Sequence, residues 1–350
     1  MDIGEVARLA GVSRSTVSYA LSGKRRISAD TRARVNAVIE EVGFRPSAPA
    51  RALAAGRTQT LALLMPRPGQ RFRLASTQMP FVVAVVHAAE QRGFDVLLSP
   101  VGGGVGREHL TRLVTERRVD GVLVMETSLP DPTAKLLHSL GATFATIGRT
   151  GSAVEHDWVD IDHAGAIEAC TRHLLDLGHR RVALVTVPRE MSAAGYGPAL
   201  QARDGFQRAV GEAGAAGTVH DCECSAAAGQ ALTRTLLDLA DPTTGFVSIN
   251  HEATAGIYAA VRAAGLSVPD DVSITGTVVP ESMADGVLVP PLTGVEVPVE
   301  ALAGGAVAAL VDRLAAPDAP WVQTLVTPPL IIRASTARPR ARAAMAGSAS

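Results

Sequence analysis

Apolar strand-like segments alternate with helix-like segments between residues 60 and 335, and this alternation limits the possible folds more than any other feature. One set of strand candidates reads TLALLMP, FDVLLSP, VDGVLVME and ATFATIG, and a second set reads RRVALVTV, GTVHDCE, GFVSIN and DVSITGTVV. Strands that alternate with helices in this way form right-handed crossovers and parallel sheets. We therefore predict two doubly wound α/β lobes.

Each predicted lobe is made of two chain segments. We assign residues 60–160 and 292–318 to the N-lobe, and residues 161–291 and 319–335 to the C-lobe. The last helix is expected at 299–315, followed by a strand over WVQTLVTPPLIIR. Open α/β sheets bind ligands at the carboxyl ends of their strands, so two lobes joined by several crossovers predict a ligand cleft. Residues 336–350 are predicted to be a disordered tail.

The charge is unevenly distributed along the chain. The net charge of −1 conceals a basic segment, because residues 1–57 hold ten Lys and Arg against five Asp and Glu. Residues 58–332 hold nineteen basic against twenty-nine acidic residues, and the last eighteen residues add four arginines. A small basic head on an acidic body predicts a polyanionic partner for the head alone.

The basic head is predicted to contain three short helices. Asp2 and Glu5 form a capping box for the first helix, and Gly11 supplies the left-handed residue that ends it. Ser13 is the expected cap of the second helix and Ser28 that of the third. The inward-facing residues are expected to be Ile3, Val6, Ala7, Ala10, Val17, Ala20, Leu21, Val35, Val38, Ile39 and Val42.

A short Gly-Val-Ser turn joins the first two helices, which is typical of a helix-turn-helix. With Val17 facing inward, the opposite face of the second helix presents Arg14, Ser15, Ser18, Tyr19 and Ser22. Short polar side chains and arginine can contact base edges and phosphates in a major groove. The spacing alone is also compatible with a solvated helical hairpin, so the residues leave both alternatives open.

The next segment, RPSAPARALAAGRTQT, contains a short Ala-rich helix expected at 48–55. Ser47 is its candidate cap, Pro49 is tolerated in its first turn, and Gly56 ends it. A helix this short is marginal in isolation, so it is expected to form against a partner or a ligand.

Three segments of the head and hinge, IGEVARLAGVSRSTVSYALSG, ISADTRARVNAVIEEVGFRP and ARALAAGRT, resemble lactose-repressor (LacI) family regulators. The segments DLGHRRVALV and ARDGF extend the resemblance into the body, so it covers residues 2–335. It implies a helix-turn-helix domain over 1–46, a hinge over 47–59 and a periplasmic-binding-protein-like body. It also implies a homodimer, with its recognition helices in successive major grooves of a pseudo-palindromic operator. Leu53 would be wedged into the central minor groove, with Ala50 one turn earlier.

The expected DNA contacts divide by type. Arg14, Ser15 and Tyr19 are expected to read bases, whereas Lys24, Arg25, Arg26 and Ser28 contact phosphates and provide salt-dependent affinity. Ser13, Thr16, Ser18, Ser22 and Thr31 complete the predicted interface. The resemblance further implies that a ligand in the cleft changes the angle between the lobes, and that the hinge transmits this change to the heads.

The resemblance also implies which residues face the effector. Arg203, in ARDGF, corresponds to the arginine that hydrogen-bonds the effector, since a planar donor fork suits hydroxyls or carboxylates. An ion pair between Arg203 and Asp162 across the cleft is an alternative that is compatible with this role. Asp162 lies at the lobe crossover, Asn250 follows a strand, and Arg149 follows the last strand of the N-lobe. Gln78, Cys224 and Val278 complete the predicted effector site.

Two departures from the family pattern concern the effector. Val278 and Val279, in GTVVPES, stand where family members commonly carry an acidic pair, and Cys224 is the nearest match to a stacking aromatic residue. Losing an acceptor and a stacking face disfavours an ordinary monosaccharide, because each buried hydroxyl needs a partner. We therefore expect an effector that is anionic or carries fewer hydroxyls, either a sugar derivative or an anionic metabolite, held by Arg203 and Arg149.

Several other classes of protein are disfavoured. The chain has no nucleophile elbow, no H-E-x-x-H sequence and no cluster of cysteine and histidine, so we expect no enzymatic activity, no cofactor and no metal. The absence of a secretory leader predicts a cytoplasmic protein with reduced thiols and disfavours a solute-binding protein. An architectural DNA-binding protein is a further alternative. The tail lacks leucine heptads, which favours a dimer over a tetramer.

Overall fold

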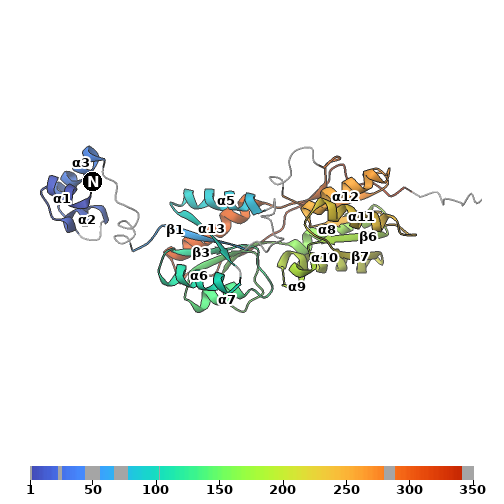
Figure 1. The fold of residues 1–350 in the computed structure, drawn as a ribbon, viewed down its shortest axis with the longest axis horizontal. Helices are drawn as coiled ribbons and strands as arrows, with labels where there is room; N and C mark the ends of the chain where they lie inside the picture. Colours follow the sequence, from blue (N-terminus) through green and yellow to red (C-terminus); the bar gives the residue numbers. More distant parts are fainter. Residues whose placement is uncertain are drawn as a thin grey trace, which may run out of the picture.

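The computed structural model describes residues 2–22, 26–43, 56–66, 78–101, 103–279 and 288–340. These residues form a three-helix head and a body of two α/β lobes (Figure 1). The prediction of two doubly wound lobes behind a helical head is therefore confirmed. None of the helices in the described ranges combines the length and the apolar character that a membrane span needs.

The head consists of α1 (Ile3–Leu9), α2 (Arg14–Ser22) and α3 (Ala29–Val42). All three predicted caps are present: the Asp2 carboxylate accepts hydrogen bonds from the N–H groups of Gly4 and Glu5, Ser13 Oγ accepts from Thr16 N–H at 3.1 Å, and Ser28 Oγ accepts from Thr31 N–H at 3.2 Å. Gly11 and Gly43 have positive φ angles and end α1 and α3.

The core of the head agrees with the predicted pattern except at one position. Its buried residues are Val6, Ala7, Ala10, Val17 and Val35. Leu21, which was predicted to face inward, is 39% exposed. The prediction was wrong because Leu21 lies in the last turn of α2, where Val17 and Ala20 already complete the contact with the core.

The N-lobe contains a six-stranded parallel sheet in the order β11-β5-β4-β3-β1-β2. Its strands are β1 (Thr60–Pro66), β2 (Asp95–Val101), β3 (Gly121–Val124), β4 (Phe144–Ile147), β5 (Asp157–Ile161) and β11 (Gln323–Val326). Helices α5 (Gln78–Gln91) and α13 (Val299–Ala315) cover one face, and α6 (Gly103–Thr115) and α7 (Pro132–Ser139) cover the other (Figure 1). Side chains of β1 alternate between two cores, because Leu61 and Leu63 pack under α5 and α13, and Ala62 and Leu64 pack under α6 and α7.

The C-lobe repeats this plan with the order β12-β10-β9-β8-β6-β7, in which only β12 is antiparallel to its neighbour. Its strands are β6 (Arg181–Thr186), β7 (Ala216–Asp221), β8 (Gly245–Ser248), β9 (Ser273–Val278), β10 (Thr293–Glu296) and β12 (Leu330–Ile331). One core lies beneath α11 (Ala226–Leu237) and α12 (His251–Ala263), and the other beneath α8 (His163–Asp176) and α10 (Gly197–Ala213). The short helix α9 (Arg189–Ala193) precedes α10.

The structure corrects the predicted lobe boundaries near the C-terminus. Strand β10 pairs with β9 of the C-lobe, and β11 pairs with β5 of the N-lobe, so residues 292–297 and 319–326 belong to the opposite lobes from those predicted. The stretch WVQTLVTPPLIIR is therefore two strands, one in each lobe, separated by Pro328 and Pro329. The chain crosses between the lobes after β5, between β10 and α13, and between β11 and β12.

The residues that follow β12 are attached to the C-lobe, in contrast to the disordered tail predicted from residue 336. Ala337 N–H donates to Ser273 Oγ at 3.0 Å, and its carbonyl accepts from His179 Nε2 at 3.0 Å. Arg340 forms an ion pair with Asp270 at 2.8 Å. The body therefore extends to residue 340, and residues 341–350 lie outside the described part of the chain.

Candidate DNA-binding surface and effector cleft

The predicted recognition face lies on α2, opposite the buried Val17. Arg14 and Ser15 are exposed there, and Thr16, Ser18 and Tyr19 are half-buried. Ser13 Oγ lies 2.8 Å from both Ser15 Oγ and Thr16 Oγ1, so the start of α2 presents a connected group of hydroxyls. This surface has the donors and acceptors that base edges and phosphates require.

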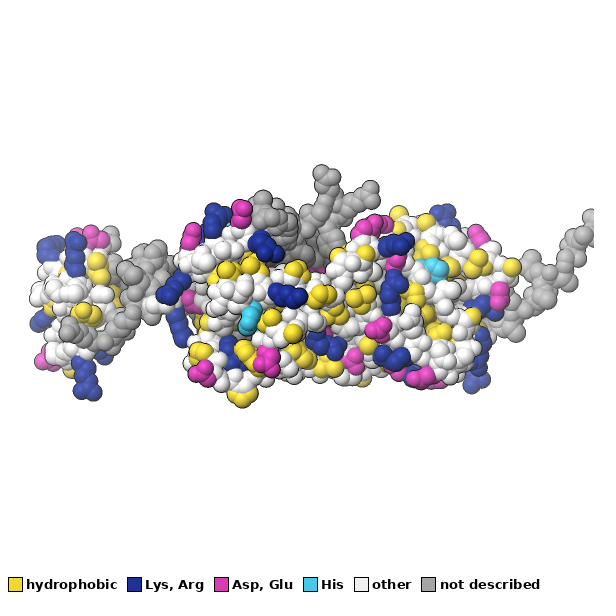
Figure 2. All heavy atoms as spheres, turned by 90° about the horizontal axis from the view of Figure 1, so that it is seen from below, with side chains coloured by type: hydrophobic (Ala, Val, Ile, Leu, Met, Phe, Trp, Pro, Cys, Tyr) yellow, Lys and Arg dark blue, Asp and Glu magenta, His cyan; other side chains and the backbone are white. Residues whose placement is uncertain are grey.

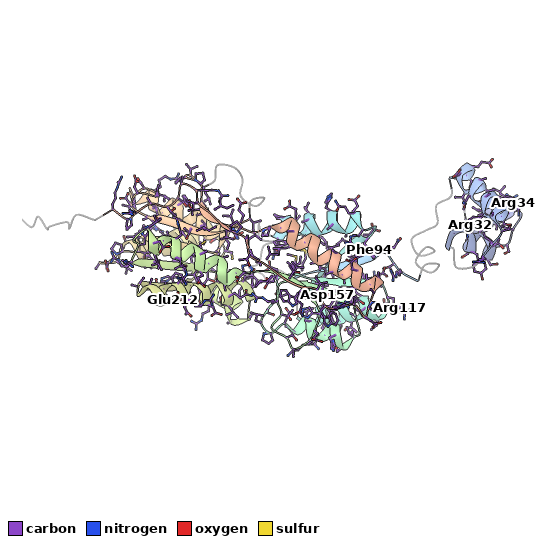
Figure 3. All side chains as sticks on the ribbon, turned by 180° about the vertical axis from the view of Figure 1, so that it is seen from behind. Arg32, Arg34, Phe94, Arg117, Asp157 and Glu212 are labelled. Atoms are coloured by element: carbon purple, nitrogen blue, oxygen red, sulfur yellow. The ribbon has the colours of Figure 1, made fainter. Side chains whose placement is uncertain are left out.

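Helix α3 adds positive charge to the head, on whose surface several basic side chains are visible in Figure 2. Arg26 is exposed before the helix, and with Arg32 and Asn36 it lines a hollow beside the helix start. Ser28 Oγ donates to Thr31 Oγ1 at 2.7 Å. Figure 3 labels Arg32 and Arg34 on the head, and both are exposed. The prediction omitted Arg32, although its place one turn into a capped helix was visible in the sequence.

Some predicted DNA contacts cannot be placed. The side chain of Ser22, residues Lys24 and Arg25, and the expected hinge helix at 48–55 with Ala50 and Leu53 lie outside the described residues.

A cavity of about 150 Å³ lies between the two lobes, at the carboxyl ends of both sheets. Three of the predicted effector residues, Gln78, Cys224 and Asn250, belong to its lining. Its other polar and titratable lining residues are Glu126, Thr127, Asp160, His163, Tyr196, Gln201, His251, Glu252 and Thr277. The apolar remainder includes Phe81, Met125, Ile147, Ile161, Val187, Met191, Ile249, Val279 and Leu302.

Glu126 is the central polar group of the cavity. Its side chain is hydrogen-bonded to Tyr196 of the C-lobe and to Gln78 of the N-lobe. Burial raises the pKa of the Glu126 carboxyl, and the two hydrogen bonds oppose this effect. Burial and the nearby Glu126 carboxylate raise the pKa of the Tyr196 hydroxyl well above its usual value. Tyr196 is therefore a proton donor across the cleft at neutral pH.

Backbone hydrogen bonds join the two lobes beside this pair. Leu129 N–H donates to Gly195 O at 2.7 Å, Gly197 N–H donates to Thr127 O at 3.1 Å, and Ser128 forms an antiparallel bridge with Tyr196. We call the two paired segments, 127–129 and 195–197, the cleft latch. Because Glu126 precedes one segment and Tyr196 lies within the other, the latch and the polar centre of the cavity form one unit.

A second contact between the lobes involves Arg149. Its Nε donates to Asp160 Oδ2 at 2.7 Å and its Nη2 donates to Gln201 Oε1 at 2.7 Å. Both partners line the cavity, whereas Arg149 does not. His163 lies close to this ion pair, and burial lowers its pKa to about 4. His163 is therefore neutral at physiological pH.

Among the described residues, the part of the cavity wall that β8 and α12 supply also carries no positive charge. Burial lowers the pKa of His251 to about 4, and its Nδ1 is buried without a hydrogen-bond partner among the described residues. Burial, followed by the nearby Glu252, raises the pKa of the Cys224 thiol to about 12. The described lining contains three carboxyl groups, at Glu126, Asp160 and Glu252, and no lysine or arginine. An anionic effector, as expected from the sequence, is therefore disfavoured.

Arg203, which is predicted from the sequence to contact the effector, is not among the residues that line the cavity. It forms an ion pair with Asp221, at the end of β7, and not with Asp162. The neighbouring residues of ARDGF serve packing, since Phe206 is buried in the C-lobe core. A Cβ atom on Gly205 would lie less than 3.0 Å from the carbonyl of Ala164, so this glycine permits the close approach of α10 to α8.

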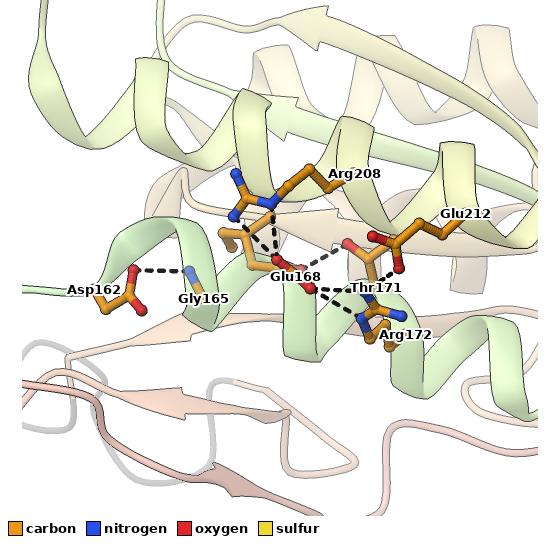
Figure 4. A network of polar contacts seen from close by, with 8 residues as sticks. Asp162, Gly165, Glu168, Thr171, Arg172, Arg208 and Glu212 are labelled. Carbon is orange, nitrogen blue, oxygen red and sulfur yellow. Dashed lines mark hydrogen bonds and ion pairs between the residues drawn. The ribbon is translucent and has the colours of Figure 1, made fainter.

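Asp162 has a structural role at the predicted crossover. Its Oδ1 accepts a hydrogen bond from Gly165 N–H at 2.9 Å and caps α8, and it does not line the cavity (Figure 4). Further along α8, Glu168 forms an ion pair with Arg208 of α10 at 3.0 Å, which ties the two helices together. It also forms an ion pair with Arg172 of its own helix at 2.8 Å.

Asn250 lines the cavity, but its amide is engaged by the protein. Oδ1 accepts from Ala253 N–H at 3.1 Å and caps α12, whereas Nδ2 donates to the carbonyls of Cys222 at 2.9 Å and Thr186 at 3.2 Å. Of the two valines in GTVVPES, Val278 is buried in the C-lobe core and Val279 faces the cavity. The valine that faces the cavity is therefore Val279, one residue after the predicted Val278.

Three of four cavity residues that sequence reasoning missed share a position. Glu126 follows β3, His163 follows β5, His251 follows β8 and Tyr196 precedes α10. The rule that ligands bind beyond the carboxyl ends of parallel strands would have selected the first three, because each lies within three residues of a strand end. Tyr196 gave no such signal, since no strand leads to it directly.

The head and the cavity together define a class of protein. A solute-binding protein has no use for a capped helix-turn-helix with a basic surface, and an architectural DNA-binding protein has no use for a polar cavity between two lobes. A chain with both is a transcriptional regulator that responds to a small molecule.

Comparison with known proteins agrees with this class. Residues 2–47 match the family described as bacterial regulatory proteins, lacI family, and residues 171–336 match the periplasmic binding protein-like domain. The HTH-type transcriptional regulator CelR of Thermobifida fusca is 30% identical over 338 residues, covering 94% of this chain and 96% of that protein. The ribose operon repressor of Escherichia coli (strain K12) is 28% identical, covering 95% of this chain and 98% of that protein.

Solved structures show the same architecture. A transcriptional regulator CelR-cellobiose complex has a TM-score of 0.68 at 27% identity, covering 96% of this chain and 99% of the other. The lac repressor dimer bound to operator and the anti-inducer ONPF has a TM-score of 0.79 at 22% identity, with the same coverage. The chain belongs to the lacI family of bacterial regulatory proteins. It is a DNA-binding transcriptional regulator controlled by an effector, and not an enzyme.

Proposed function

We propose that the chain is a cytoplasmic repressor whose effector is a neutral, hydroxyl-rich molecule of one ring, bound in the interlobe cavity. The observation that carries this proposal is the hydrogen-bonded group of Glu126, Tyr196 and Gln78, which offers acceptors and donors from both lobes at one point. A ligand that contacts this group favours one arrangement of the lobes over another.

The chemistry of the lining supports a neutral polyol. Carboxyl oxygens of Glu126, Asp160 and Glu252 accept hydrogen bonds from hydroxyls, and the amide of Gln201 and the neutral His251 add further polar contacts. Apolar side chains such as Phe81 suit the C–H faces of a sugar ring. The absence of lysine and arginine from the described lining disfavours phosphorylated or carboxylated ligands.

The cavity volume supports a ligand of one ring. An apolar protein cavity of about the same volume accommodates benzene, which is one six-membered ring. One relative was solved with cellobiose and another, from Enterococcus faecium, with bound ribose. By size, the present cavity is closer to the requirements of a monosaccharide.

We propose that the latch couples the cavity to DNA. Glu126 directly precedes segment 127–129, and Tyr196 lies within segment 195–197. A ligand hydroxyl that bonds to either side chain therefore affects the pairing of these two segments. A change in that pairing alters the angle between the lobes and hence the spacing of the two chains that lead to the heads. Coupling free energies of about 1–3 kcal/mol are typical of such systems.

The DNA-bound form is proposed to be a homodimer on a pseudo-palindromic operator. In the N-lobe, α5 carries an exposed apolar stripe of Met79, Val83 and Val86, which are 48%, 62% and 42% exposed. A second copy of this chain is the occupant we assign to the stripe, since the lac repressor structure, which shares the fold, is a dimer. The proposed DNA-contacting residues are those on α2 and at the start of α3, with the hinge residues Ala50 and Leu53.

Two measurements test the proposal. Titration calorimetry with a panel of neutral pentoses, hexoses, disaccharides and sugar phosphates should give binding for one group of neutral monosaccharides, and Glu126→Ala should abolish it. A footprint on genomic fragments should then show a short protected palindrome whose occupancy changes with that sugar. Tight binding of a sugar phosphate, with no effect of neutral sugars, would contradict the effector class.

A further inference from the structure

The guanidinium group of Arg14 lies against the first turn of α1, at Gly4. A Cβ atom on Gly4 would lie less than 3.0 Å from three atoms of Arg14, including Cζ at 2.7 Å. Real Cβ contacts are essentially never this short, so this position of Arg14 exists only because residue 4 has no side chain. Arg14 is the first residue of α2 and is exposed.

The same turn of α1 holds a fixed negative charge. The Asp2 carboxylate accepts hydrogen bonds from Gly4 N–H at 2.6 Å and from Glu5 N–H at 3.0 Å. These two bonds lower the pKa of Asp2, and the nearby Arg14 charge acts in the same direction. Arg14 therefore has a space for its guanidinium at Gly4, and the Asp2 carboxylate places a negative charge on the same turn.

The other residues at the start of α2 are fixed by one another. Ser13 Oγ lies 2.8 Å from Ser15 Oγ and from Thr16 Oγ1, and it caps the helix. Arg14 is thus the one long side chain in this first turn, and its guanidinium packs against α1 at Gly4. An arginine reads a guanine through two parallel hydrogen bonds, so its orientation decides which base pair it reaches.

From this geometry we infer that Gly4 is a specificity-determining residue of the DNA-binding head, acting through Arg14. The inference rests on the proposed role of α2 as the recognition helix. A side chain at residue 4 displaces the guanidinium from α1, because the end of a flexible arginine moves more readily than a helix backbone. Operator preference therefore changes at the base pairs that Arg14 reads, although Gly4 itself contributes no polar side chain.

The experiment is a selection of operators from a randomised library, carried out with the full-length protein at one salt concentration. Four proteins are compared: the wild type, Gly4→Ala, Arg14→Ala and the double variant. Gly4→Ala should change the preference at the same base positions as Arg14→Ala, and should weaken binding to the best wild-type operator by about two- to tenfold, since the arginine is no longer pre-oriented. In the Arg14→Ala background, Gly4→Ala should have no effect.

Controls separate this effect from folding. Alanine favours a helix more than glycine does, so Gly4→Ala should not lower the melting temperature. Gly304→Ala in α13, where an added Cβ meets nothing within 4 Å, is the matched control and should leave the preference unchanged. Asp2→Asn keeps a capping side chain but removes the counter-charge, and should produce a smaller change at the same positions.

Three outcomes would overturn the inference. One is an unchanged operator preference for Gly4→Ala, and a second is an effect of Gly4→Ala that persists in full without Arg14. The third is an unchanged preference for Arg14→Ala, since Arg14 would then read no base. Failure of the wild type to select any sequence would instead refute the proposed function.

Discussion

Arg149 of the N-lobe donates a hydrogen bond to Gln201 of the C-lobe, with 2.7 Å between Nη2 and Oε1. The same guanidinium forms an ion pair with Asp160 of β5, whose side chain is 4% exposed. Arg149 is thus held in its own lobe by an ion pair, and its Nη2 group donates to a residue of the other lobe. This contact exists only while the lobes keep their present separation.

Gln201→Ala should therefore weaken effector binding, both by destabilising this arrangement of the lobes and by removing an amide that lines the cavity. Loss of one hydrogen bond to a partly exposed charged group is worth about 1 kcal/mol, which is about fivefold in the dissociation constant. Calorimetry with the identified effector measures the change. Gln207→Ala is the matched control, because Gln207 lies on the same helix and is exposed. Equal effects of both variants would show that the contact with Arg149 has no role.

Glu126→Gln should increase stability while reducing effector affinity. The raised pKa of Glu126 means that the folded protein keeps this proton at a higher pH than the unfolded chain does. The free energy of unfolding consequently falls as the pH rises from the ordinary value of 4.5 through the raised pKa, and glutamine removes this loss. The variant should also lose about fivefold or more in effector affinity, since glutamine replaces one of the two carboxyl oxygens that can accept from ligand hydroxyls and one hydrogen bond contributes about 1 kcal/mol.

Denaturant unfolding at several pH values tests the stability effect. Plotted against pH, the free energies of unfolding of Glu126→Gln and the wild type should converge below pH 4.5. Above pH 4.5 they should separate, with the variant more stable. Glu155→Gln, at an exposed position of the N-lobe, should not separate from the wild type in this way. A variant less stable than the wild type at neutral pH would mean that the hydrogen bonds from Tyr196 and Gln78 outweigh the cost of burial.

The sequence predicted the fold well where local rules decide the structure. Capping residues such as Asp2 and Ser28 and the alternation of strand and helix identified the head and both lobes, because these signals depend on neighbours in the chain. The final two strands were merged because their apolar run looked continuous. Pro328 and Pro329 marked the break, since proline interrupts strand pairing.

The candidate site was less predictable for a physical reason. Asp162 and Asn250 do lie beyond strand ends, but their side chains are used to cap the helices that follow. A polar residue between a strand and a helix can face either the helix or the cleft, and the sequence does not distinguish the two. Glu126 and Tyr196 come together only because segments 127–129 and 195–197 pair across the lobes, which no local pattern encodes.

Acid should destabilise the two-lobed body through the histidines of the cavity. His163 and His251 have pKa values of about 4 in the folded protein, below the ordinary value of 6.5. Between these values the unfolded chain binds more protons, so the free energy of unfolding falls as the pH falls from 6.5 towards 4. Each histidine contributes up to about 3 kcal/mol to this loss.

His251→Gln should accordingly flatten the loss of stability between pH 6.5 and 4, as measured by chemical unfolding. Its Nδ1 has no partner among the described residues, so the substitution removes few contacts. His87→Gln, on the exposed surface of α5, serves as the control. A pH dependence identical to that of the wild type would show that protonation of His251 is not coupled to unfolding.

Gly205→Ala should destabilise the C-lobe by about 1–3 kcal/mol, the usual cost of overpacking. The added methyl group meets the backbone of Ala164, which cannot move without separating α10 from α8. Thermal unfolding measures the loss. Gly211→Ala lies on the same helix with nothing within 4 Å of the new Cβ, and should be neutral or slightly stabilising. If both variants unfold at the same temperature, the two helices have more freedom than their contact implies.

Arg203→Ala tests whether Arg203 contacts the effector, as predicted from the sequence, or lies outside the effector site, as in the structure. Arg203 pairs with Asp221 outside the cavity, so its removal should leave effector affinity within about twofold of the wild type. The free energy of unfolding should fall by about 1 kcal/mol, because Asp221 loses a partly buried partner. Calorimetry and denaturant unfolding of the same preparation give both quantities. A large loss of affinity with unchanged stability would return Arg203 to the effector site and would require the cavity to rearrange when ligand binds.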